Sequence, residues 1–168
     1  MSYHIEPLAD GHDLDAFTCG HDTLDAWLKE HARGATGQGT RSYLLVEQAT
    51  GAVVGYFALA PHLIERDEAP SRVRRGAPRR IPAILLAKLA LHERLRGEGL
   101  GVELLVHALT TIVAAAYSGG GRVVVVDAID ENTAAFYRAH DFQPSPTDPH
   151  RLVMKLSTAA RALGLTWP

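Results

Sequence analysis

The stretch Arg94–Gly101, RLRGEGLG, holds three glycines at alternate positions. It follows the apolar run Ile84–Leu91 and precedes a second apolar run, Val102–Ala116, with helical periodicity. Glycine lets successive backbone N–H groups approach an anion without a Cβ in the way, and a helix N-terminus adds free donors and a favourable dipole. The stretch is therefore typical of a turn that binds a phosphate or pyrophosphate. A tight glycine turn without a ligand is the alternative.

Two common phosphate-binding motifs do not fit this turn. A dinucleotide fingerprint needs glycine at its first, third and sixth positions, and counted from Gly97 the sixth position is Val102. A Walker A loop ends in Gly-Lys-Ser or Gly-Lys-Thr, which the stretch lacks. The remaining pattern is Arg96-x-x-Gly99-x-Gly101 between a strand and a helix.

A second set of candidate residues lies in Asp127–Phe142, DAIDENTAAFYRAHDF. Tyrosine has a pKa near ~10, so Tyr137 keeps its proton at neutral pH and can hand it to a departing group. The alternative is that Tyr137 packs in the core, like its neighbour Phe136. Adjacent helix residues point about 100° apart, so these two rings cannot fill the same place. Asn132 is either an ordinary first-turn helix residue or a ligand contact.

Together, LALHERLRGEGLG and DAIDENTAAFYRAHDF resemble the motifs of the GNAT family of N-acetyltransferases, which use acetyl-CoA. The resemblance implies that a strand pairs with the pantetheine arm of the coenzyme and that the glycine turn holds its pyrophosphate. These two roles fall to Leu89, Ala90 and Leu91 and to Arg96, Gly97, Glu98, Gly99, Leu100 and Gly101. The resemblance also places Asn132 and Phe136 among the coenzyme contacts and makes Tyr137 the catalytic proton donor. The family usually has glycine where this chain has Asp141, which we expect to alter the turn into the last strands but not the site chemistry.

The N-terminal third narrows the resemblance. Phe17–Ala32, FTCGHDTLDAWLKEHA, followed by RSYLLVE, is similar to the acetyltransferase toxins of toxin–antitoxin pairs. For this chain the similarity, which covers roughly residues 3 to 156, implies acetylation of the α-amino group of aminoacyl-tRNA and a block of translation. It also implies neutralisation by a ribbon–helix–helix antitoxin, and a homodimer.

Arg72–Arg80, RVRRGAPRR, carries five arginines and no acidic residue, although the whole chain has a net charge of −2. A solvated, poorly ordered arginine loop is the usual interpretation of such a run. The alternative is a tRNA-binding surface, since phosphate contacts supply salt-dependent affinity. With the toxin resemblance we expect the second, and the candidate RNA-binding residues are Arg72, Arg74, Arg75, Arg79 and Arg80. Lys29, Arg33 and Arg41 could extend this surface.

Composition and residue spacing argue against several other classes. Hydrophobic residues make up 46% and charged residues 21%, an ordinary soluble globular composition. The nine histidines show no zinc spacing, so no metal is expected. Cys19 is the only cysteine, which excludes an intrachain disulfide, and without a nearby base we interpret it as structural. Because neither a signal peptide nor an uninterrupted membrane-spanning run is visible, we expect a cytoplasmic protein with no membrane partner.

The elements that position these residues form a mixed α/β pattern. We expect strands over residues 3–8, 41–47, 52–60, 84–91, 123–126 and 151–156, and helices after residue 22, after residue 101 and, with Asp130 as the N-cap, through His140. Residues 65–80 are expected to be a connection and residues 144–149 a loop. Strand, helix and strand between Ile84 and Val126 imply a parallel pair. We therefore expect a single domain over residues 1–168, with a mixed sheet flanked by helices and a C-terminal tail over 157–168.

Two other functions remain open from the sequence. One is a GNAT acetyltransferase of a small amine or a protein N-terminus. The other is a non-catalytic module that binds coenzyme A or RNA; the presence of Tyr137 argues against it.

Overall fold

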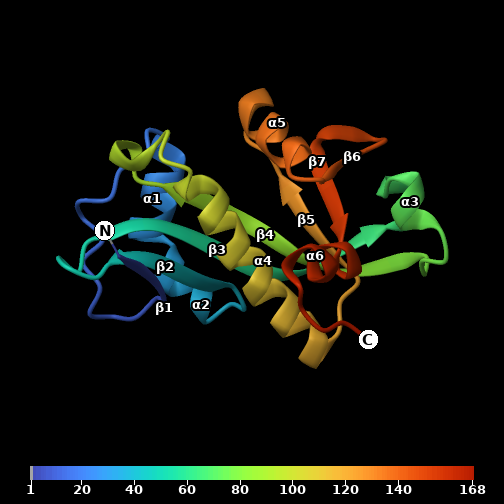
Figure 1. Ribbon diagram of the computed structural model, residues 1–168, viewed down its shortest axis with the longest axis horizontal. Helices are drawn as coiled ribbons and strands as arrows, with labels where there is room; N and C mark the ends of the chain where they lie inside the picture. The colour runs from blue at the N-terminus through green and yellow to red at the C-terminus, as the bar shows by residue number, and fades with distance from the viewer. Residues whose placement is uncertain (1) are drawn as a thin grey trace. The chain divides into compact units, whose positions relative to one another are not determined.

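The computed structural model describes residues 2–168 and has one seven-stranded sheet with the strand order β1-β2-β3-β4-β5-β7-β6 (Figure 1). The strands are β1 (Tyr3–Pro7), β2 (Arg41–Glu47), β3 (Val53–Glu65), β4 (Arg80–Leu91), β5 (Val123–Asp127), β6 (Gln143–Ser145) and β7 (Asp148–Lys155). The helices are α1 (Asp22–Glu30), α2 (Ala32–Thr36), α3 (Ser71–Arg74), α4 (Leu100–Gly119), α5 (Glu131–Ala139) and α6 (Leu156–Leu163), with short 3-10 turns η1 (Arg66–Glu68) and η2 (Glu93–Leu95). Strands β4 and β5 are parallel, while β1–β2, β2–β3, β5–β7 and β6–β7 are antiparallel. The predicted α/β class with a mixed sheet is confirmed.

The chain divides into two compact units, of which the first holds residues 2–60 and 87–108. In its core, the buried residues Leu24 and Leu28 of helix α1 belong to one apolar cluster with the rings of Phe17 and Tyr56. The Tyr56 hydroxyl donates a hydrogen bond to the Leu24 carbonyl at 2.7 Å, and the ring of Trp27 stacks on Tyr56. Phe17 meets the same tyrosine edge-on. These contacts fix the segment Phe17–Ala32, which resembles the toxins, against β3.

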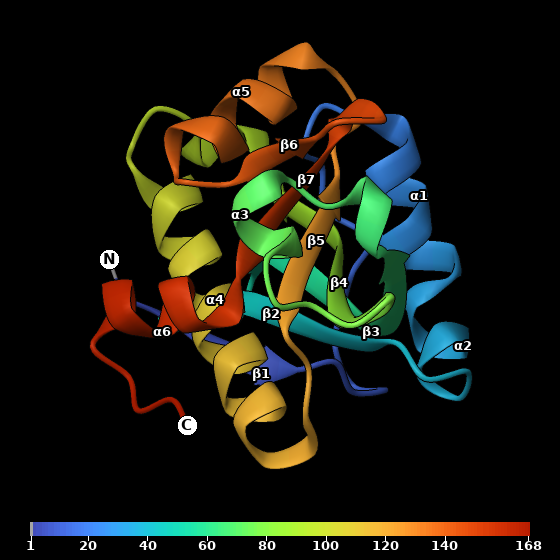
Figure 2. The ribbon, with the colours of Figure 1, turned by 90° about the vertical axis from the view of Figure 1, so that its right-hand side faces the viewer.

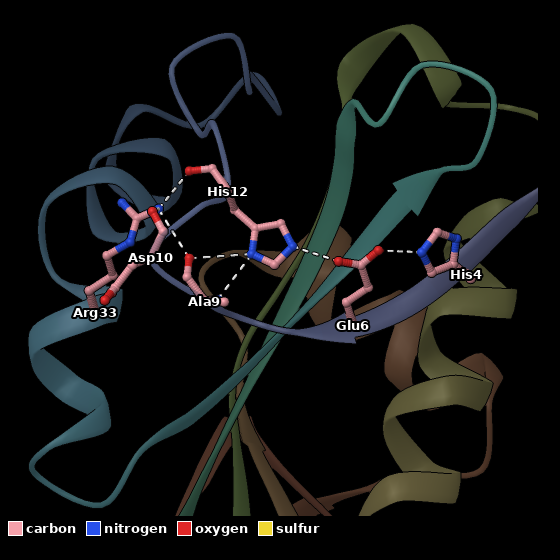
Figure 3. Close-up of polar contacts among 6 residues, drawn as sticks. All are labelled: His4, Glu6, Ala9, Asp10, His12 and Arg33. Atoms are coloured by element: carbon pink, nitrogen blue, oxygen red, sulfur yellow. Dashed lines mark hydrogen bonds and ion pairs between the residues drawn. The ribbon is translucent and has the colours of Figure 1, made fainter.

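A polar network in this unit links β1 to the segment that precedes α1 (Figure 3). Glu6 accepts a hydrogen bond from Nε2 of His12 at 2.7 Å and is also bonded to Nε2 of His4. The backbone N–H of Ala9 donates to Nδ1 of His12 at 3.0 Å, so Nε2 is the nitrogen that carries the proton. Arg33 on α2 donates to the His12 carbonyl at 2.6 Å. The hydrogen bonds from His12 and His4 hold the pKa of Glu6 below its usual value.

The second unit holds residues 61–86 and 109–168. Its four-valine strand segment Val123–Val126 is buried along its whole length, as the continuous apolar run predicted. Helix α5 packs against β7 and β6 and lies next to them in Figure 2. Asp130 begins α5 by accepting a hydrogen bond from the Thr133 N–H at 2.8 Å, which confirms the predicted N-cap.

Among residues 2–168, α4 is the one helix long and apolar enough to cross a membrane by length and composition. A core helix of a folded domain has the same properties. The predicted helical stripe is buried in the protein: Leu104, Leu105, Ala108, Leu109, Ile112 and Val113. The helix therefore has the burial pattern of a core helix.

Two predicted connections contain regular structure. Residues 65–80 were expected to be a connection, but β3 continues to Glu65, α3 occupies Ser71–Arg74 and β4 begins at Arg80. Residues 144–149 were expected to be a loop, but β6 and the start of β7 pair across them. Proline and charge obscured both segments, and β6, at the edge of the sheet, is a place where proline is tolerated. Asp141 takes the left-handed conformation that glycine favours, with φ +71°, and so fills the glycine position of the family with the same kind of backbone.

Candidate active site

The glycine turn lies where the sequence predicted, between the end of β4 and the start of α4. Gly97 and Gly99 have φ of +81° and +77°, in the left-handed region that side chains disfavour, and α4 begins at Leu100. A Cβ added at Gly97, Gly99 or Gly101 would meet nothing within 4 Å. Open space therefore lies over the turn, and the first-turn N–H groups of α4 have no acceptor in their own helix. The turn fits an anion, and its role as the pyrophosphate site remains a prediction.

The side chain of Arg96, an exposed residue, reaches the N-terminal motif. Its Nη2 donates to the carbonyl of Cys19, and a Cβ on Gly20 would lie 3.1 Å from the same nitrogen. Arg96 thus ties the glycine turn to the segment Phe17–Gly20. The sequence did not predict this hydrogen bond, because no local sequence pattern indicates a contact between Arg96 and Cys19, which lie far apart in the chain.

Cys19 is buried and takes part in this tie through its backbone. Its N–H donates to Asp25 Oδ1 at 2.9 Å, and its thiol is directed to the His21 carbonyl. Burial and the neighbouring Asp25 raise the pKa of the Cys19 thiol to about 11, so it stays protonated at neutral pH. A protonated, buried thiol is a poor nucleophile, which agrees with the structural interpretation of Cys19.

The strand segment predicted to pair with the pantetheine arm is the last part of β4. Ala90 is buried, whereas Leu89 and Leu91 are half-buried. The ladder between β4 and β5 runs from Ala83 and Val123 to Leu85 and Val125, so residues 89–91 lie beyond it. Backbone groups in this part of a strand are available to a partner other than β5.

The candidate residues of α5 differ in exposure. Asn132 is exposed, Phe136 is half-buried and Tyr137 is 3% exposed. The Tyr137 ring meets Phe136 edge-on at 5.3 Å between centroids and Phe142 at 5.2 Å. Within residues 2–168 its hydroxyl forms no hydrogen bond, and burial raises its pKa above the ordinary value. Tyr137 is therefore protonated at neutral pH, and its hydroxyl is not used by any other group in residues 2–168; its role as proton donor remains a prediction.

The five arginines of 72–80 are all exposed, but their segment is anchored rather than loose. Val73 and Ala77 between them are buried in the core of the second unit. Arg80 lies 3.5 Å from Glu65, the one ion pair of these arginines among the described residues. The arginines are therefore solvent-exposed, as the first interpretation expected, on a segment anchored by Val73 and Ala77, and their RNA-binding role remains a prediction.

Among residues 2–168, no three His, Cys, Asp or Glu side chains are placed to hold a metal ion. The clustered acidic and basic groups of the second unit form structural ion pairs instead. Arg151 binds Asp127 through two hydrogen bonds, of 2.8 and 3.0 Å, and Glu68 at 3.1 Å.

Comparison with known proteins places this geometry in a family. No family model matches the chain. The tRNA-acetylating toxin of Mycobacterium tuberculosis (strain ATCC 25618 / H37Rv) is 38% identical over 166 residues, covering 98% of this chain and 99% of that protein. A probable toxin TacT of Sinorhizobium fredii (strain NBRC 101917 / NGR234) is 32% identical, covering 95% of this chain and 94% of its own length.

Solved structures agree with these relatives. A tyrosine-to-phenylalanine variant of KacT and AtaT complexed with acetyl-methionyl-tRNAfMet each superpose with a TM-score of 0.87 and 27% identity, covering 96% of this chain and 99% of theirs. A tyrosine-to-phenylalanine variant of AtaT, bound to the C-terminus of the antitoxin AtaR and to acetyl-CoA, has a TM-score of 0.80 and 27% identity, covering 95% of this chain and 97% of its own. The fold is that of the GNAT acetyltransferases. The chain belongs to the family of tRNA-acetylating toxins.

Proposed function

We propose that this protein transfers an acetyl group from acetyl-CoA to the α-amino group of aminoacyl-tRNA and acts as the toxin of a toxin–antitoxin pair. The observation that carries the proposal is the 38% identity to a tRNA-acetylating toxin over 98% of the chain. The complex of AtaT with acetyl-methionyl-tRNAfMet supports the same reaction.

The residues of the chain suit the coenzyme that this reaction needs. Gly97, Gly99 and Gly101 leave open space beside the first turn of α4, which suits a pyrophosphate. The end of β4, at Leu89–Leu91, offers backbone groups to the pantetheine arm. Asn132, exposed on α5, and half-buried Phe136 would add coenzyme contacts. Acetyl-CoA supplies the activated acetyl group as a thioester.

The reaction needs a neutral amine and an acid for the departing sulfur. An α-amino group has a pKa near ~8, so a useful fraction is neutral at pH 7 and no strong base is required. The amine nitrogen attacks the thioester carbonyl, the nitrogen gives up one proton to water as the amide forms, the carbon–sulfur bond breaks, and the coenzyme leaves as a thiolate that takes up a proton. Tyr137, protonated and with a free hydroxyl within the described chain, is the proposed donor of that proton.

The partners follow from the same family. KacT and AtaT form complexes with their antitoxins, and we propose that an antitoxin of the ribbon–helix–helix class neutralises this chain as well. Because charged tRNA is its substrate, we propose that the protein works in the cytoplasm, and that it does so as a homodimer.

One transfer assay tests the proposal. Purified protein is incubated with labelled acetyl-CoA and, in parallel, charged tRNA, deacylated tRNA, a polyamine and a peptide with a free N-terminus. Label should enter the charged tRNA alone, and inducing the wild-type protein should arrest growth. Label in the polyamine or the peptide, with none in charged tRNA, would instead make the protein a small-amine or N-terminal acetyltransferase.

A further inference from the structure

Two clefts open on the second unit, and neither belongs to the residues assigned to acetyl-CoA. The first has a volume of about 440 Å³ and is lined by residues that include Arg72, Arg138 and Lys155. The second has a volume of about 420 Å³ and is lined by residues that include Arg122, Lys155 and Trp167. Because Lys155 lines both, the two clefts share a wall.

The clefts are positively charged although the chain as a whole is slightly acidic. Asp141 is the one acidic residue that lines either of them. Arg138 pairs with Glu131, but within residues 2–168 Arg72, Arg122 and Lys155 form no ion pair. Three cations without acidic partners favour an anionic ligand along this wall.

Arg122 has hydrogen-bonding capacity that no other group in residues 2–168 uses. Its Nη2 donates to the Arg75 carbonyl at 3.3 Å, and its backbone is held by Pro82 and Leu156. Its Nε is buried and has no partner among the described residues. A buried guanidinium N–H without an acceptor is costly, so this side chain is not fully satisfied by its own fold. Because Arg122 also lines the second cleft, the part of its guanidinium that faces the cleft can donate charge-assisted hydrogen bonds to a phosphate.

The start of α6 adds donors to the same wall. Lys155 is its N-cap and provides no side-chain cap, while Ser157 lines the second cleft and Thr158 the first. First-turn N–H groups have no acceptor within their own helix, and the helix dipole favours an anion there. Together with Arg122 they make a wall suited to more than one phosphate.

Trp167 gives the second cleft an aromatic surface beside these cations. Cationic grooves with exposed aromatic rings bind single-stranded nucleic acid, because the cations follow the backbone while a base stacks on the ring. An acidic peptide would satisfy the cations but gains less from a flat ring.

We propose that the paired clefts bind the RNA of the aminoacyl-tRNA substrate, with successive phosphates along Arg72, Lys155 and Arg122 and an unpaired base against Trp167. This inference rests on the proposed function for the identity of the RNA. It extends the arginine surface of residues 72–80 to residues that the sequence did not single out.

Binding of deacylated tRNA tests the proposal separately from catalysis. Lys155→Gln should weaken tRNA binding several-fold and make the slope of log affinity against log salt shallower by about 1. The matched control is Arg161→Gln, which removes the same charge from an exposed position of α6 that lines neither cleft. In acetyl transfer, Lys155→Gln should raise KM for charged tRNA and leave kcat unchanged.

Tryptophan fluorescence gives a second, independent measurement. Bound tRNA should quench Trp167, and the Trp167→Phe variant should lose that quenching while Trp27 still fluoresces and affinity is largely kept, because phenylalanine also stacks. Equal affinity and salt slope for Lys155→Gln and Arg161→Gln would overturn the inference. The inference would also be overturned if Lys155→Gln kept its tRNA affinity but bound the antitoxin more weakly, because the clefts would then be a protein-docking surface. Failure of the wild type to acetylate charged tRNA would count against the proposed function alone, since deacylated tRNA reports on the clefts.

Discussion

At the residue scale, Tyr137 combines a buried ring with an unused hydroxyl. Its ring packs on Phe136 and Phe142, and its hydroxyl bonds to nothing else in residues 2–168. Tyr137→Phe should therefore lower kcat by about 10²–10⁴-fold, the usual contribution of a general acid, and leave the thermal midpoint unchanged. Kinetics and calorimetry on the same preparation measure both. A lowered thermal midpoint in Tyr137→Phe would mean that the hydroxyl has a structural role.

The pH profile adds a check on the same residue. Burial raises the pKa of Tyr137 above its ordinary value, so the tyrosine keeps its proton when the pH rises. In wild type, kcat should therefore show no alkaline decline from this group below about pH 10. A decline near pH 8 or 9 that disappears in Tyr137→Phe would contradict the assignment of a raised pKa.

Arg96 shows what residue types reveal and what they leave out. The spacing of Arg96, Gly99 and Gly101 predicted a strand-to-helix turn, and the structure has it, because glycine backbone angles and helix starts are local properties. The Arg96 side chain, however, donates a hydrogen bond to the carbonyl of Cys19, 77 residues away in sequence. Such contacts depend on how β4 and the segment Phe17–Gly20 meet, which no local pattern encodes.

Gly20 makes that contact testable. It has φ +87°, and a Cβ there would lie 3.1 Å from the Arg96 guanidinium. Gly20→Ala should destabilise the protein by about 1 kcal/mol or more and weaken acetyl-CoA binding through the displaced turn. Gly11→Ala is the control, because Gly11 has no positive φ and nothing lies within 4 Å of its Cβ position. Calorimetric titration with acetyl-CoA and thermal unfolding compare the two; equal effects would show that the Arg96 contact is unimportant.

At the scale of elements, the strongly periodic segments were predicted well and the polar ones were not. The stripe of α4 and the valine run of β5 are buried as expected. Strand β6 was missed because Pro144 and its polar neighbours look like a loop, and its pairing with β7 provides the hydrogen bonds that define it. Apolar periodicity is a local signal, whereas the pairing of a short edge strand depends on its partner.

The network around Glu6 links elements in a way that responds to pH. Hydrogen bonds from His12 and His4 lower the pKa of Glu6, so the carboxylate stabilises the fold above its unfolded pKa, near 4.5, and this stabilisation is lost as the pH falls through the lowered value. Glu6→Gln should therefore lower the thermal midpoint at pH 6 to 7, and the difference from wild type should shrink below pH 4.5 and vanish once wild-type Glu6 is protonated. Glu30→Gln, at an exposed position of α1, should show no such pH dependence. A difference that persists unchanged at the lowest pH would contradict this role.

At the scale of the whole molecule, the continuity of the long elements bears on how the chain unfolds. Strand β3, strand β4 and helix α4 each begin in one of the two compact units and end in the other. Separate unfolding of one unit would have to break three regular elements in their middle, where backbone hydrogen bonds are most cooperative. We therefore propose that residues 1–168 form the single domain expected from the sequence.

That proposal predicts one thermal transition. The calorimetric and van't Hoff enthalpies of unfolding should be equal, and circular dichroism and tryptophan fluorescence should report the same midpoint. The two tryptophans make the comparison direct, because Trp27 lies in the first unit and Trp167 in the second. Trp27→Phe and Trp167→Phe each leave a single fluorescent tryptophan. In each variant, the midpoint measured by fluorescence should equal the midpoint measured by circular dichroism on the same protein. Different fluorescence midpoints within otherwise equal unfolding curves would show that the units unfold independently.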